Sequence, residues 1–480
     1  MATPPRRGSP LDETLNETAD APTGAGGAEQ SWVPVLVLLW SRDEPERCGE
    51  AVHLPPDSRE LFTIGRAVDV DEDGAIPLSL GQLRPGGRVD TGPLRSARVS
   101  RRQLTIGRDA GDGLRVEQTG RNTVRLDGHA MTSGVIHPGS VVEVEHRLLF
   151  LYTRRPATWV RPRPAGPGDG FAFGAADPWG IVGESPATWE LRQHVGFLAA
   201  RDEHVIVLGP SGSGKELVVQ ALHGRSRRAR GPLVARNAAT IPEALIDAEL
   251  FGNLRNYPNP GTPERPGLLG EADGGALFLD EIGELPPRLQ AHLLRVMDRG
   301  EYQRLGESRA RRADVRLLAA TNRDPSELKH DFLARFPHRL RVPGLDDRPE
   351  DILLIARHIL AGLAASAPAP QQGGPTLGPE LVASLVGYRF TTHVRELQEL
   401  LWRALKRDGG PALAPPPDLV QVARPRPAAL ESSPGFVTLT RDAVLAALER
   451  CGGVKEVAWR ELGLRNRYHL HRVLKKLGVE

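Results

Sequence analysis

The residues from Gly209 to Glu216, GPSGSGKE, have the composition and spacing of a loop that holds phosphate groups. The apolar run Val205–Leu208 leads into this loop, and a helical pattern follows Lys215. Glycines let backbone N–H groups curl around phosphate oxygens, a lysine here reaches the β- and γ-phosphates, and the helix N-terminus favours negative charge. A chance glycine-rich turn is the alternative, but the strand before it and the helix after it argue against that. The expected nucleotide contacts are Gly209, Pro210, Ser211, Gly212, Ser213, Gly214, Lys215 and Glu216.

A second group of polar residues follows two apolar strands. The run ALFLDE ends in Asp280, which could hold Mg²⁺ through water, and in Glu281, which could polarise an attacking water. A structural ion pair is the plainer explanation of such a pair taken alone, and its coupling to the loop at Gly209 favours catalysis. Asn322 ends the next apolar strand, where its side chain could orient water near the γ-phosphate. Arg335 and Arg395 are candidates for charge stabilisation, in trans and in cis.

The elements that must position these residues alternate between strand and helix after Trp179. Such alternation predicts an α/β unit with a parallel sheet covered by helices on both faces. From 348 to 406 the pattern is helical only, as in a lid. The expected elements are strands over 204–209, 233–237, 276–280 and 315–321 and helices over 215–225, 242–250 and 286–300.

Length, composition and charge fit a multidomain chain. At 480 residues it has room for about three domains. The formal net charge is only +2, although the last residues are strongly basic. Two cysteines, Cys48 and Cys451, support neither a disulfide framework nor a metal site. No run is long and apolar enough to span a membrane, and the first residues lack an export signal, so we expect a cytoplasmic protein without a membrane partner.

Residues 181 to about 406 resemble the AAA+ domain of sigma-54-dependent bacterial transcriptional activators. The matching words occur in the family's order and at its spacing: IVGES (181–185), GPSGSGKE (209–216), ARNAA (235–239), ELFG (249–252), EADGGALFLDEIGELP (271–286), QAHLLRVMDRGEYQRLG (290–306), LLAATN (317–322) and HVREL (393–397).

The resemblance implies an ATP site with Mg²⁺ and assembly into a homo-oligomeric ring. The family carries a glutamate at the position of Glu216, and Ile181 and Val182 of the first word are expected beside the nucleotide. By position, Asn237 couples the nucleotide state to a loop, Asn322 is sensor I, Arg335 is an arginine finger and Arg395 is sensor II.

Three departures from the family's sequence pattern concern the contact with the sigma factor, the relay of the nucleotide state and the boundary between subunits. NYPNPG (256–261) stands where the family has its sigma-contacting GAFTGA, so that Pro258–Asn259 replace the Phe–Thr pair. Gly270 stands where the family has a glutamate that relays the nucleotide state, and Lys329 replaces one of two boundary arginines. A lysine cannot reproduce a bidentate arginine contact.

Residues 60–152 resemble a forkhead-associated (FHA) domain, a β-sandwich that binds phosphothreonine peptides. Short apolar runs separated by turn signals between Trp32 and about Arg155 predict a sandwich or barrel. Two arginines and a hydroxyl on adjacent loops make a good phosphate cup. The alternative is a sandwich that serves only as an interaction surface, since Gln103 replaces the family's buried histidine. The predicted phosphopeptide contacts are Arg66, Ser100, Arg101 and Asn122.

The C-terminal segment 443–478 resembles the Fis-type helix-turn-helix of the same activators. A basic helical hairpin without DNA binding is the alternative, and Val454 replaces the family's usual Asn. The residues expected to face DNA are Arg465, Asn466, Arg467, Tyr468, His469, His471 and Arg472.

Two functions remain open from the sequence. One is an ATP-hydrolysing activator that opens sigma-54 RNA polymerase complexes under control of a phosphothreonine protein. The other is a phosphopeptide- and DNA-binding regulator that uses ATP as an assembly switch. The expected domains are a disordered 1–31, an FHA-like 32–156, a linker 157–178, an ATPase core 179–345, a helical lid 346–407, a Pro-rich linker 408–436 and a sequence-specific DNA-binding 437–480.

Overall fold

The structure of the chain is a computed structural model. It describes residues 31–55, 60–66, 69, 74–109, 113–163, 170–365, 375–407, 412–417, 419, 448 and 474. The chain divides into two compact units, residues 1–428 and residues 429–480. The predicted DNA-facing residues from Arg465 to Arg472 lie outside the described residues.

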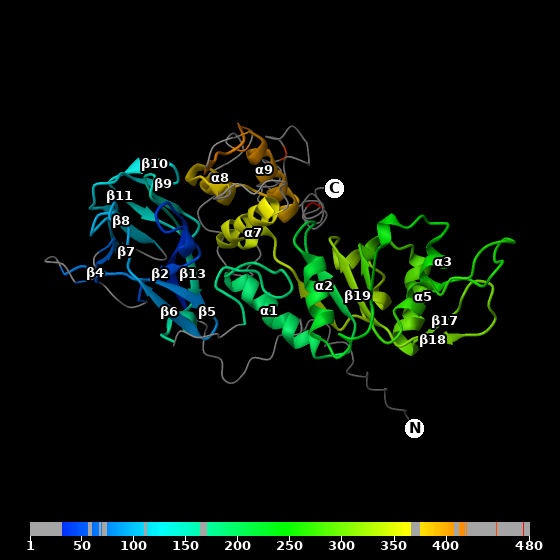
Figure 1. The fold of residues 1–480 in the computed structure, drawn as a ribbon. Helices are drawn as coiled ribbons and strands as arrows, with labels where there is room; N and C mark the ends of the chain where they lie inside the picture. Colours follow the sequence, from blue (N-terminus) through cyan, green and yellow to red (C-terminus); the bar gives the residue numbers. More distant parts are fainter. Residues whose placement is uncertain are drawn as a thin grey trace, which may run out of the picture. The chain divides into compact units, whose positions relative to one another are not determined.

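The N-terminal part is a two-sheet β-sandwich (Figure 1). One sheet has eight strands in the order β10-β9-β12-β13-β1-β2-β5-β6, and the other has five in the order β11-β8-β7-β3-β4. The strands are β1 (Trp32–Ser41), β2 (Ala51–His53), β3 (Phe62–Ile64), β4 (Ile76–Pro77), β5 (Leu80–Arg84), β6 (Gly87–Gly92), β7 (Leu104–Arg108), β8 (Leu114–Gln118), β9 (Val124–Leu126), β10 (His129–Met131), β11 (Ser133–Ile136), β12 (Val141–Val144) and β13 (Leu148–Pro156). The 3₁₀ turns η1 (Pro45–Arg47) and η2 (Ala157–Val160) accompany them.

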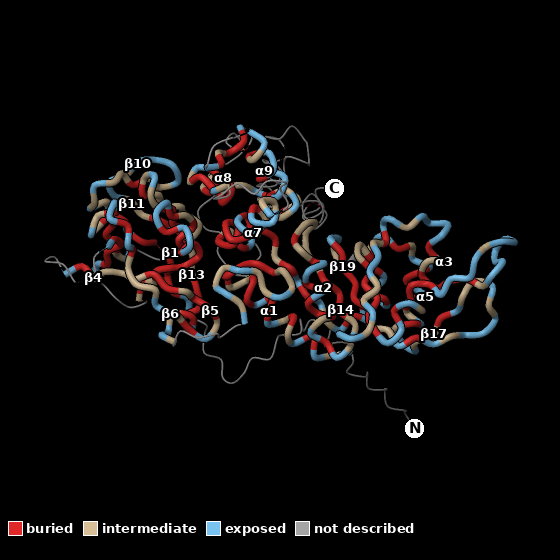
Figure 2. Tube along the Cα trace, in the orientation of Figure 1, coloured by how far each residue is buried: buried red, intermediate tan, exposed pale blue. Residues whose placement is uncertain are grey.

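Strand β1 is buried on both of its faces, as the red tube over it in Figure 2 shows. Successive side chains of a strand point to opposite faces. Leu36 and Leu38 accordingly join the core between the two sheets, whereas Val35 and Val37 belong to a separate apolar cluster that includes helices of the C-terminal half of the unit. A continuous apolar run is what a doubly buried strand requires, and β1 has one.

The second part of the unit is built on a parallel sheet in the order β15-β16-β19-β14-β20. Its strands are β14 (Val205–Leu208), β15 (Leu233–Asn237), β16 (Ala276–Asp280), β19 (Arg316–Thr321) and β20 (His338–Arg341). Its helices are α1 (Pro186–Ala199), α2 (Lys215–Gly224), α3 (Ile246–Phe251), α4 (Gly267–Glu271), α5 (Pro287–Arg299) and α6 (His330–Leu333). Smaller elements are η3 (Ala238–Thr240), η4 (Ile282–Glu284), β17 (Glu301–Tyr302), β18 (Arg311–Arg312) and η5 (Pro325–Glu327).

A helical lid follows this sheet. It comprises η6 (Leu345–Asp347), η7 (Pro349–Asp351), α7 (Ile352–Ala365), β21 (Thr376–Leu377), α8 (Pro379–Gly387), α9 (His393–Arg407) and β22 (Ala412–Leu413). Its apolar cluster is the one that also holds Val35 and Val37 of β1. No helix among the described residues is long and apolar enough to cross a membrane.

The architecture confirms the coarse prediction of a β-rich N-terminal region followed by an α/β ATPase-type domain with a helical part. The strands expected over 233–237 and 276–280 have these same bounds in the structure. The helix expected over 242–250 occurs as α3, which begins only at Ile246, after a turn closed by the hydrogen bond from Leu245 N to Pro242 O. Within the predicted linker, Phe171 is packed: its ring stacks on Trp189 at 5.9 Å.

Candidate functional site

The phosphate-type loop lies between β14 and α2, at the carboxyl ends of the parallel strands. Gly212 and Gly214 have φ of 71° and 98°, a region that side-chain-bearing residues rarely adopt. The Nζ atom of Lys215 donates to the carbonyl oxygens of Gly209 and Pro210, at 3.1 and 3.2 Å. Burial lowers the pKa of Lys215, while Glu281 and Asp280 oppose that shift by their negative charge. The predicted lysine therefore lies within electrostatic range of the acidic pair, while its Nζ atom bonds to carbonyl oxygens of the loop.

Parallel strands bring their carboxyl ends to one edge, and three predicted polar residues end there. Asn237 of β15 is the register partner of Asp280 of β16. Asn322 directly follows β19 and is exposed. Asn237 also caps η3, because its Oδ1 accepts from Ala239 N at 2.9 Å. This arrangement places an amide that is held by the backbone beside the carboxylate expected near Mg²⁺.

The carboxylates of this edge fit a magnesium ion that arrives with a nucleotide. Among the described residues, no group of three or more His, Cys, Asp or Glu side chains is arranged to hold a metal ion. Mg²⁺ in nucleotide sites uses one or two carboxylates together with phosphates and water. Asp280, whose Oδ1 accepts from Glu281 N at 2.9 Å, can supply that single carboxylate.

The first turn of α9, the last helix of the lid, contacts the loop. Val394 N donates to Gly212 O at 3.0 Å, and Arg395 Nη1 donates to Ser211 Oγ at 3.3 Å. A Cβ on Gly212 would come within 2.1 Å of Thr392 O, so this close approach requires glycine. The structure thus brings the predicted Arg395 to the predicted loop across more than 180 residues of chain.

The remaining predicted nucleotide residues lie in two different settings. Ile181 is buried in the apolar cluster that includes Val218 and Val219 of α2, and Val182 lies in the apolar cluster shared by the lid and β1. Glu216 is exposed in the first turn of α2, where negative charge is favourable. Arg335 instead pairs with Asp298 of α5, and no described contact joins it to the loop of its own chain.

The segment 256–261 forms a closed turn held by Asn253, whose side chain is buried. Its Nδ2 donates to the carbonyl oxygens of Leu254, Tyr257 and Pro263. Tyr257 is 43% exposed and packs on Gly306, where a Cβ would lie 2.7 Å from its ring. Sequence reasoning named this segment but not Asn253, whose signal is only a polar residue directly after ELFG.

The two other departures occupy separate places. Gly270 lies on α4, and a Cβ there would be 3.2 Å from the Tyr302 hydroxyl. Lys329 is exposed and precedes α6.

The predicted phosphopeptide residues come together on neighbouring loops of the sandwich. Arg66 Nε donates to Val99 O at 3.1 Å, directly before Ser100. Ser100 Oγ accepts from Arg121 N at 3.1 Å, next to Asn122. Arg101 follows Ser100 and is exposed.

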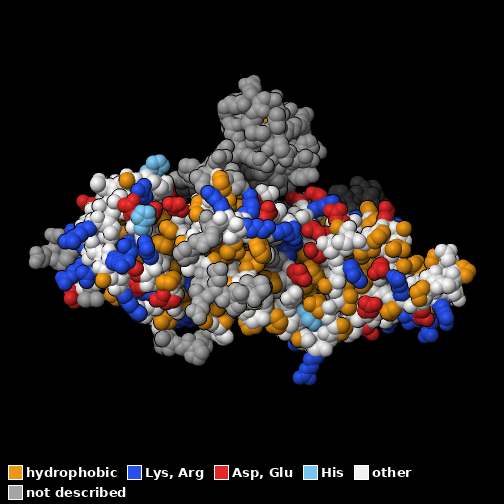
Figure 3. Space-filling view, turned by 45° about the horizontal axis from the view of Figure 1, so that its top comes forward, with side chains coloured by type: hydrophobic (Ala, Val, Ile, Leu, Met, Phe, Trp, Pro, Cys, Tyr) orange, Lys and Arg blue, Asp and Glu red, His pale blue; other side chains and the backbone are white. Residues whose placement is uncertain are grey.

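Gln103 holds these loops together from inside. It is fully buried, its Nε2 donates to Asn122 O at 2.8 Å, and its Oε1 accepts from Asn122 Nδ2 at 3.1 Å. This glutamine therefore links the strand after Ser100 to the loop of Asn122. On the face drawn in Figure 3, Lys and Arg side chains are interspersed with Asp and Glu over the described surface.

Comparison with known proteins places residues 181–345 in a known family. They match the family model described as the Sigma-54 interaction domain. The transcriptional regulatory protein ZraR of Klebsiella oxytoca is 37% identical over 308 residues, which cover 60% of this chain and 67% of that protein. The anaerobic nitric oxide reductase transcription regulator NorR of Escherichia coli O9:H4 (strain HS) is 40% identical over 250 residues, which cover 50% of this chain and 48% of NorR. A crystal structure of NtrX from Brucella abortus in complex with ADP is 30% identical, with a TM-score of 0.46, and the match covers 62% of this chain and 70% of NtrX.

Proposed function

Because the chain belongs to the family of transcriptional regulators that carry the sigma-54 interaction domain, we propose that it is an ATP-binding regulator of transcription. The observation that carries this proposal is the meeting of three features at one sheet edge. These are the glycine loop with Lys215, the Asp280–Glu281 pair and the lid arginine Arg395. Each comes from a different element, and in this proposal a triphosphate binds among them.

Each group at the site has a chemical role in this proposal. Backbone N–H groups of the loop and Lys215 bind the β- and γ-phosphates. A magnesium ion bound with the nucleotide supplies charge neutralisation, and Asp280 holds it. Glu281 accepts the proton of the attacking water, and Asn322 orients that water. Arg395 stabilises phosphate charge from within the chain.

We further propose that hydrolysis takes place at a boundary between copies of the chain. Arg335 is half exposed on the surface beside α5, so it is available to a neighbouring copy. In phosphoryl transfer, an arginine that reaches the γ-phosphate in trans strongly stabilises the charge of the transition state. A homo-oligomeric ring is the assembly that satisfies every such site.

In this proposal, the N-terminal sandwich receives the regulatory signal and the C-terminal segment binds the target DNA. The loops of Arg66, Ser100 and Asn122 form a cup for a phosphothreonine peptide, supported by the buried Gln103 that joins them. The basic segment 437–480 reads DNA as a helix-turn-helix. The domain boundaries proposed are those expected from the sequence, with the ATPase core over 179–345 and its lid over 346–407.

The second candidate is an ATP-dependent assembly switch that does not remodel sigma-54 polymerase. A specific observation favours it: the segment 256–261 is a turn tied to buried Asn253, with Pro258 and Asn259 at its tip. Prolines restrict the backbone, and three side-chain hydrogen bonds restrict it further. Such a turn is a poor match for a loop that changes position with the nucleotide.

The test uses the full-length protein with Mg-ATP and a sigma-54 promoter. ATP binding, ATP turnover and open-complex formation are measured for the unaltered chain, Lys215→Ala and Glu281→Gln. We expect Lys215→Ala to lose binding, and Glu281→Gln to bind ATP without turnover. The same nucleotide affinity in Lys215→Ala and in the unaltered chain would refute the site. Turnover without open complexes would support the switch over the activator.

A further inference from the structure

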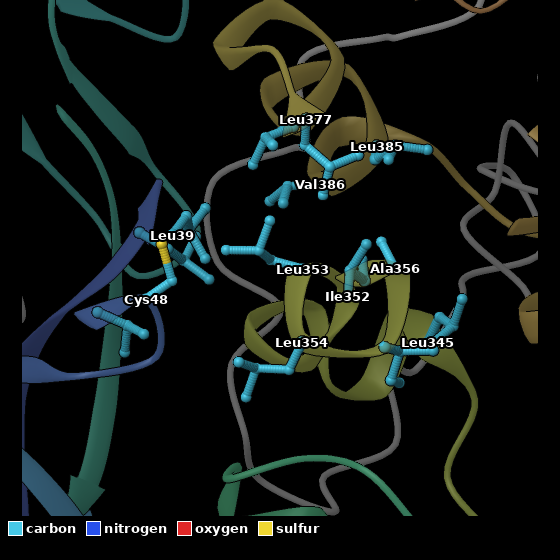
Figure 4. Close-up of a cluster of buried hydrophobic side chains, with 14 of the residues drawn as sticks. Leu39, Cys48, Leu345, Ile352, Leu353, Leu354, Ala356, Leu377, Leu385 and Val386 are labelled. Atoms are coloured by element: carbon cyan, nitrogen blue, oxygen red, sulfur yellow. The ribbon is translucent and has the colours of Figure 1, made fainter. Parts of the chain in front are cut away.

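The outer face of the large sheet is covered by the lid. Figure 4 shows Leu39 and Cys48 of the sandwich directed toward Leu353 and Leu354 of α7. The contact is close, because a Cβ on Gly49 would lie 3.3 Å from Leu354 Cδ2. Apolar residues on both faces of β1 make this cover a requirement, since an uncovered face would leave a continuous apolar stripe in water.

Two arginines of the sandwich form buried ion pairs with the ATPase part. Arg155 of β13 is 2% exposed, and its Nη2 lies 2.9 Å from Glu350 Oε2. Its Nη1 donates to Glu184 O. Arg84 of β5 pairs with Glu184 through Nε to Oε2 at 2.9 Å and through Nη2 to Oε1 at 2.5 Å. Buried pairs fix geometry, because a lost partner leaves an uncompensated charge.

The hydrogen bonds continue from these pairs into the lid. Asp351 follows Glu350, and its Oδ1 accepts from the backbone N–H groups of Glu184 and Ser185, at 2.7 and 2.9 Å. Its Oδ2 accepts from Thr188 Oγ1 at 2.7 Å. The carboxylate of Asp351 therefore ties the lid both to the Glu184–Ser185 segment, which the sandwich contacts, and to Thr188 at the start of α1.

Arg348 completes the connection to the phosphate-type loop. It is 4% exposed, and its Nη1 donates to Thr188 Oγ1 at 3.3 Å. Its Nη2 donates to Ser213 O, also at 3.3 Å. In a trans peptide the C=O and the following N–H point in opposite directions. Holding Ser213 O toward Arg348 therefore turns the Gly214 N–H away from Arg348, so that Arg348 fixes the orientation of this peptide of the loop.

From this chain of contacts we infer that Arg348 is a positioning residue for the nucleotide site and that docking of the sandwich sets its position. Nucleotide binding and sandwich docking are then coupled through Glu184, Asp351 and Arg348. The inference rests on the proposed ATP site. It assigns to the sandwich an effect on nucleotide affinity that is carried by buried contacts inside one unit.

The experiment measures affinity for a fluorescent ADP analogue with Mg²⁺ in the full-length protein. The variants are Arg348→Lys, Arg155→Met and the milder Glu350→Gln, which keeps the shape of the side chain and removes its charge at the assay pH of about 8, where the carboxyl is ionised. Arg125→Met is the matched control, since it breaks a half-exposed pair with Glu145 elsewhere in the sandwich. We expect about 5-fold or greater weakening in all three relay variants, within the usual range of coupling between sites, and no change in the control.

A second readout separates positioning from general loss of stability. The ³¹P chemical shift of the β-phosphate of bound ADP reports the donors around that phosphate. It should move in Arg348→Lys and in Glu350→Gln at temperatures far below unfolding, and stay fixed in Arg125→Met.

The outcomes distinguish failure of the proposed ATP site from failure of the proposed coupling. Absence of ADP binding in the unaltered chain would refute the proposed ATP site itself. Normal binding there, with unchanged affinity and ³¹P shift in Arg155→Met and Glu350→Gln, would overturn the coupling even if Arg348→Lys binds weakly.

Discussion

Arg335 and Asp298 form an ion pair between the residues after α6 and the end of α5, with Arg335 Nε 2.5 Å from Asp298 Oδ1. The two side chains are 47% and 39% exposed. Exposed pairs contribute little, about 0–1 kcal/mol, so exchange of Arg335 to a phosphate on a neighbouring copy costs little. In the proposed assembly, this weak pair leaves Arg335 free to move to a neighbouring copy.

Replacing this arginine tests its role in trans. Arg335→Ala should lower ATP turnover by about 10³-fold or more, because the charge on the transferred phosphate loses its stabilising partner. ADP affinity, measured at protein concentrations below assembly, should stay within about twofold of the unaltered chain, a difference of less than 1 kcal/mol. Asp298→Asn is the control and should change turnover only slightly. Equal turnover in Arg335→Ala would contradict the assignment.

The turn at 256–261 is tested by a double replacement. Pro258→Phe with Asn259→Thr places an exposed aromatic and a hydroxyl at the tip, where the chain now has a stiff backbone. We expect open-complex formation on a sigma-54 promoter to rise above that of the unaltered chain, while ATP turnover stays the same. Tyr257→Ala serves as the control for simple loosening of the turn. If the unaltered chain forms open complexes as well as the double variant does, this turn does not limit open-complex formation.

The proposed phosphopeptide site of the sandwich gives a third prediction. Arg66→Ala and Ser100→Ala should each weaken binding of a phosphothreonine peptide about 10-fold or more, because hydrogen bonds to charged groups contribute about 1.5–3 kcal/mol. Arg115→Ala, which breaks an exposed pair with Asp109, is the matched control. Binding is measured by fluorescence anisotropy with the phosphorylated peptide and its unphosphorylated form. Equal affinity for the two peptides would show that the sandwich is an interaction surface of another kind.

The junction between sandwich and lid should make stability depend on pH. Burial raises the pKa of Glu350 to about 7, against the opposing effect of Arg155, and Asp351 adds to the rise. The folded-state pKa lies above the ordinary value, so the protonated form favours folding. This contribution is fully present below about pH 4.5 and is lost as the pH rises through 7.

Urea unfolding at several pH values measures this effect. Between pH 5.5 and 8 the unaltered chain should lose about 2 kcal/mol relative to Glu350→Gln, which cannot titrate. Parallel curves for the two proteins would mean that Glu350 stays ionised in the folded state.

The local parts of the site could be predicted from contiguous motifs, and the family resemblance added Arg395, but the buried ion pairs that join the sandwich to the ATPase part could not be predicted. An apolar run that ends in Asp280 and a glycine loop that ends in Lys215 are contiguous signals, and both elements occur where they were expected. Asn237 beside Asp280 follows from the parallel order of two strands. Arg84 and Arg155 had no such signal, because their carboxylate partners lie 100 and 195 residues further along the chain.

The apolar run Val33–Trp40 has the length of a strand, and the structure shows that both faces of β1 are buried. What covers the second face could not be predicted, because the alternation within one strand says nothing about its partner. Phe171 was assigned to a linker for its glycine- and proline-rich neighbours, although its ring stacks on Trp189. Composition describes the average of a segment, and a single aromatic residue within it can still dock.

The doubly buried strand β1 also limits how this protein can be rearranged. A sandwich whose outer face depends on α7 and α8 cannot be exchanged for the input module of another regulator as an independent cassette. A working chimera would have to carry the lid helices along with the sandwich, or replace Val33, Val35 and Val37 with polar residues. The sandwich and the ATPase part should therefore evolve together. Among related proteins, we expect substitutions at Leu353 or Leu354 to be accompanied by substitutions in β1.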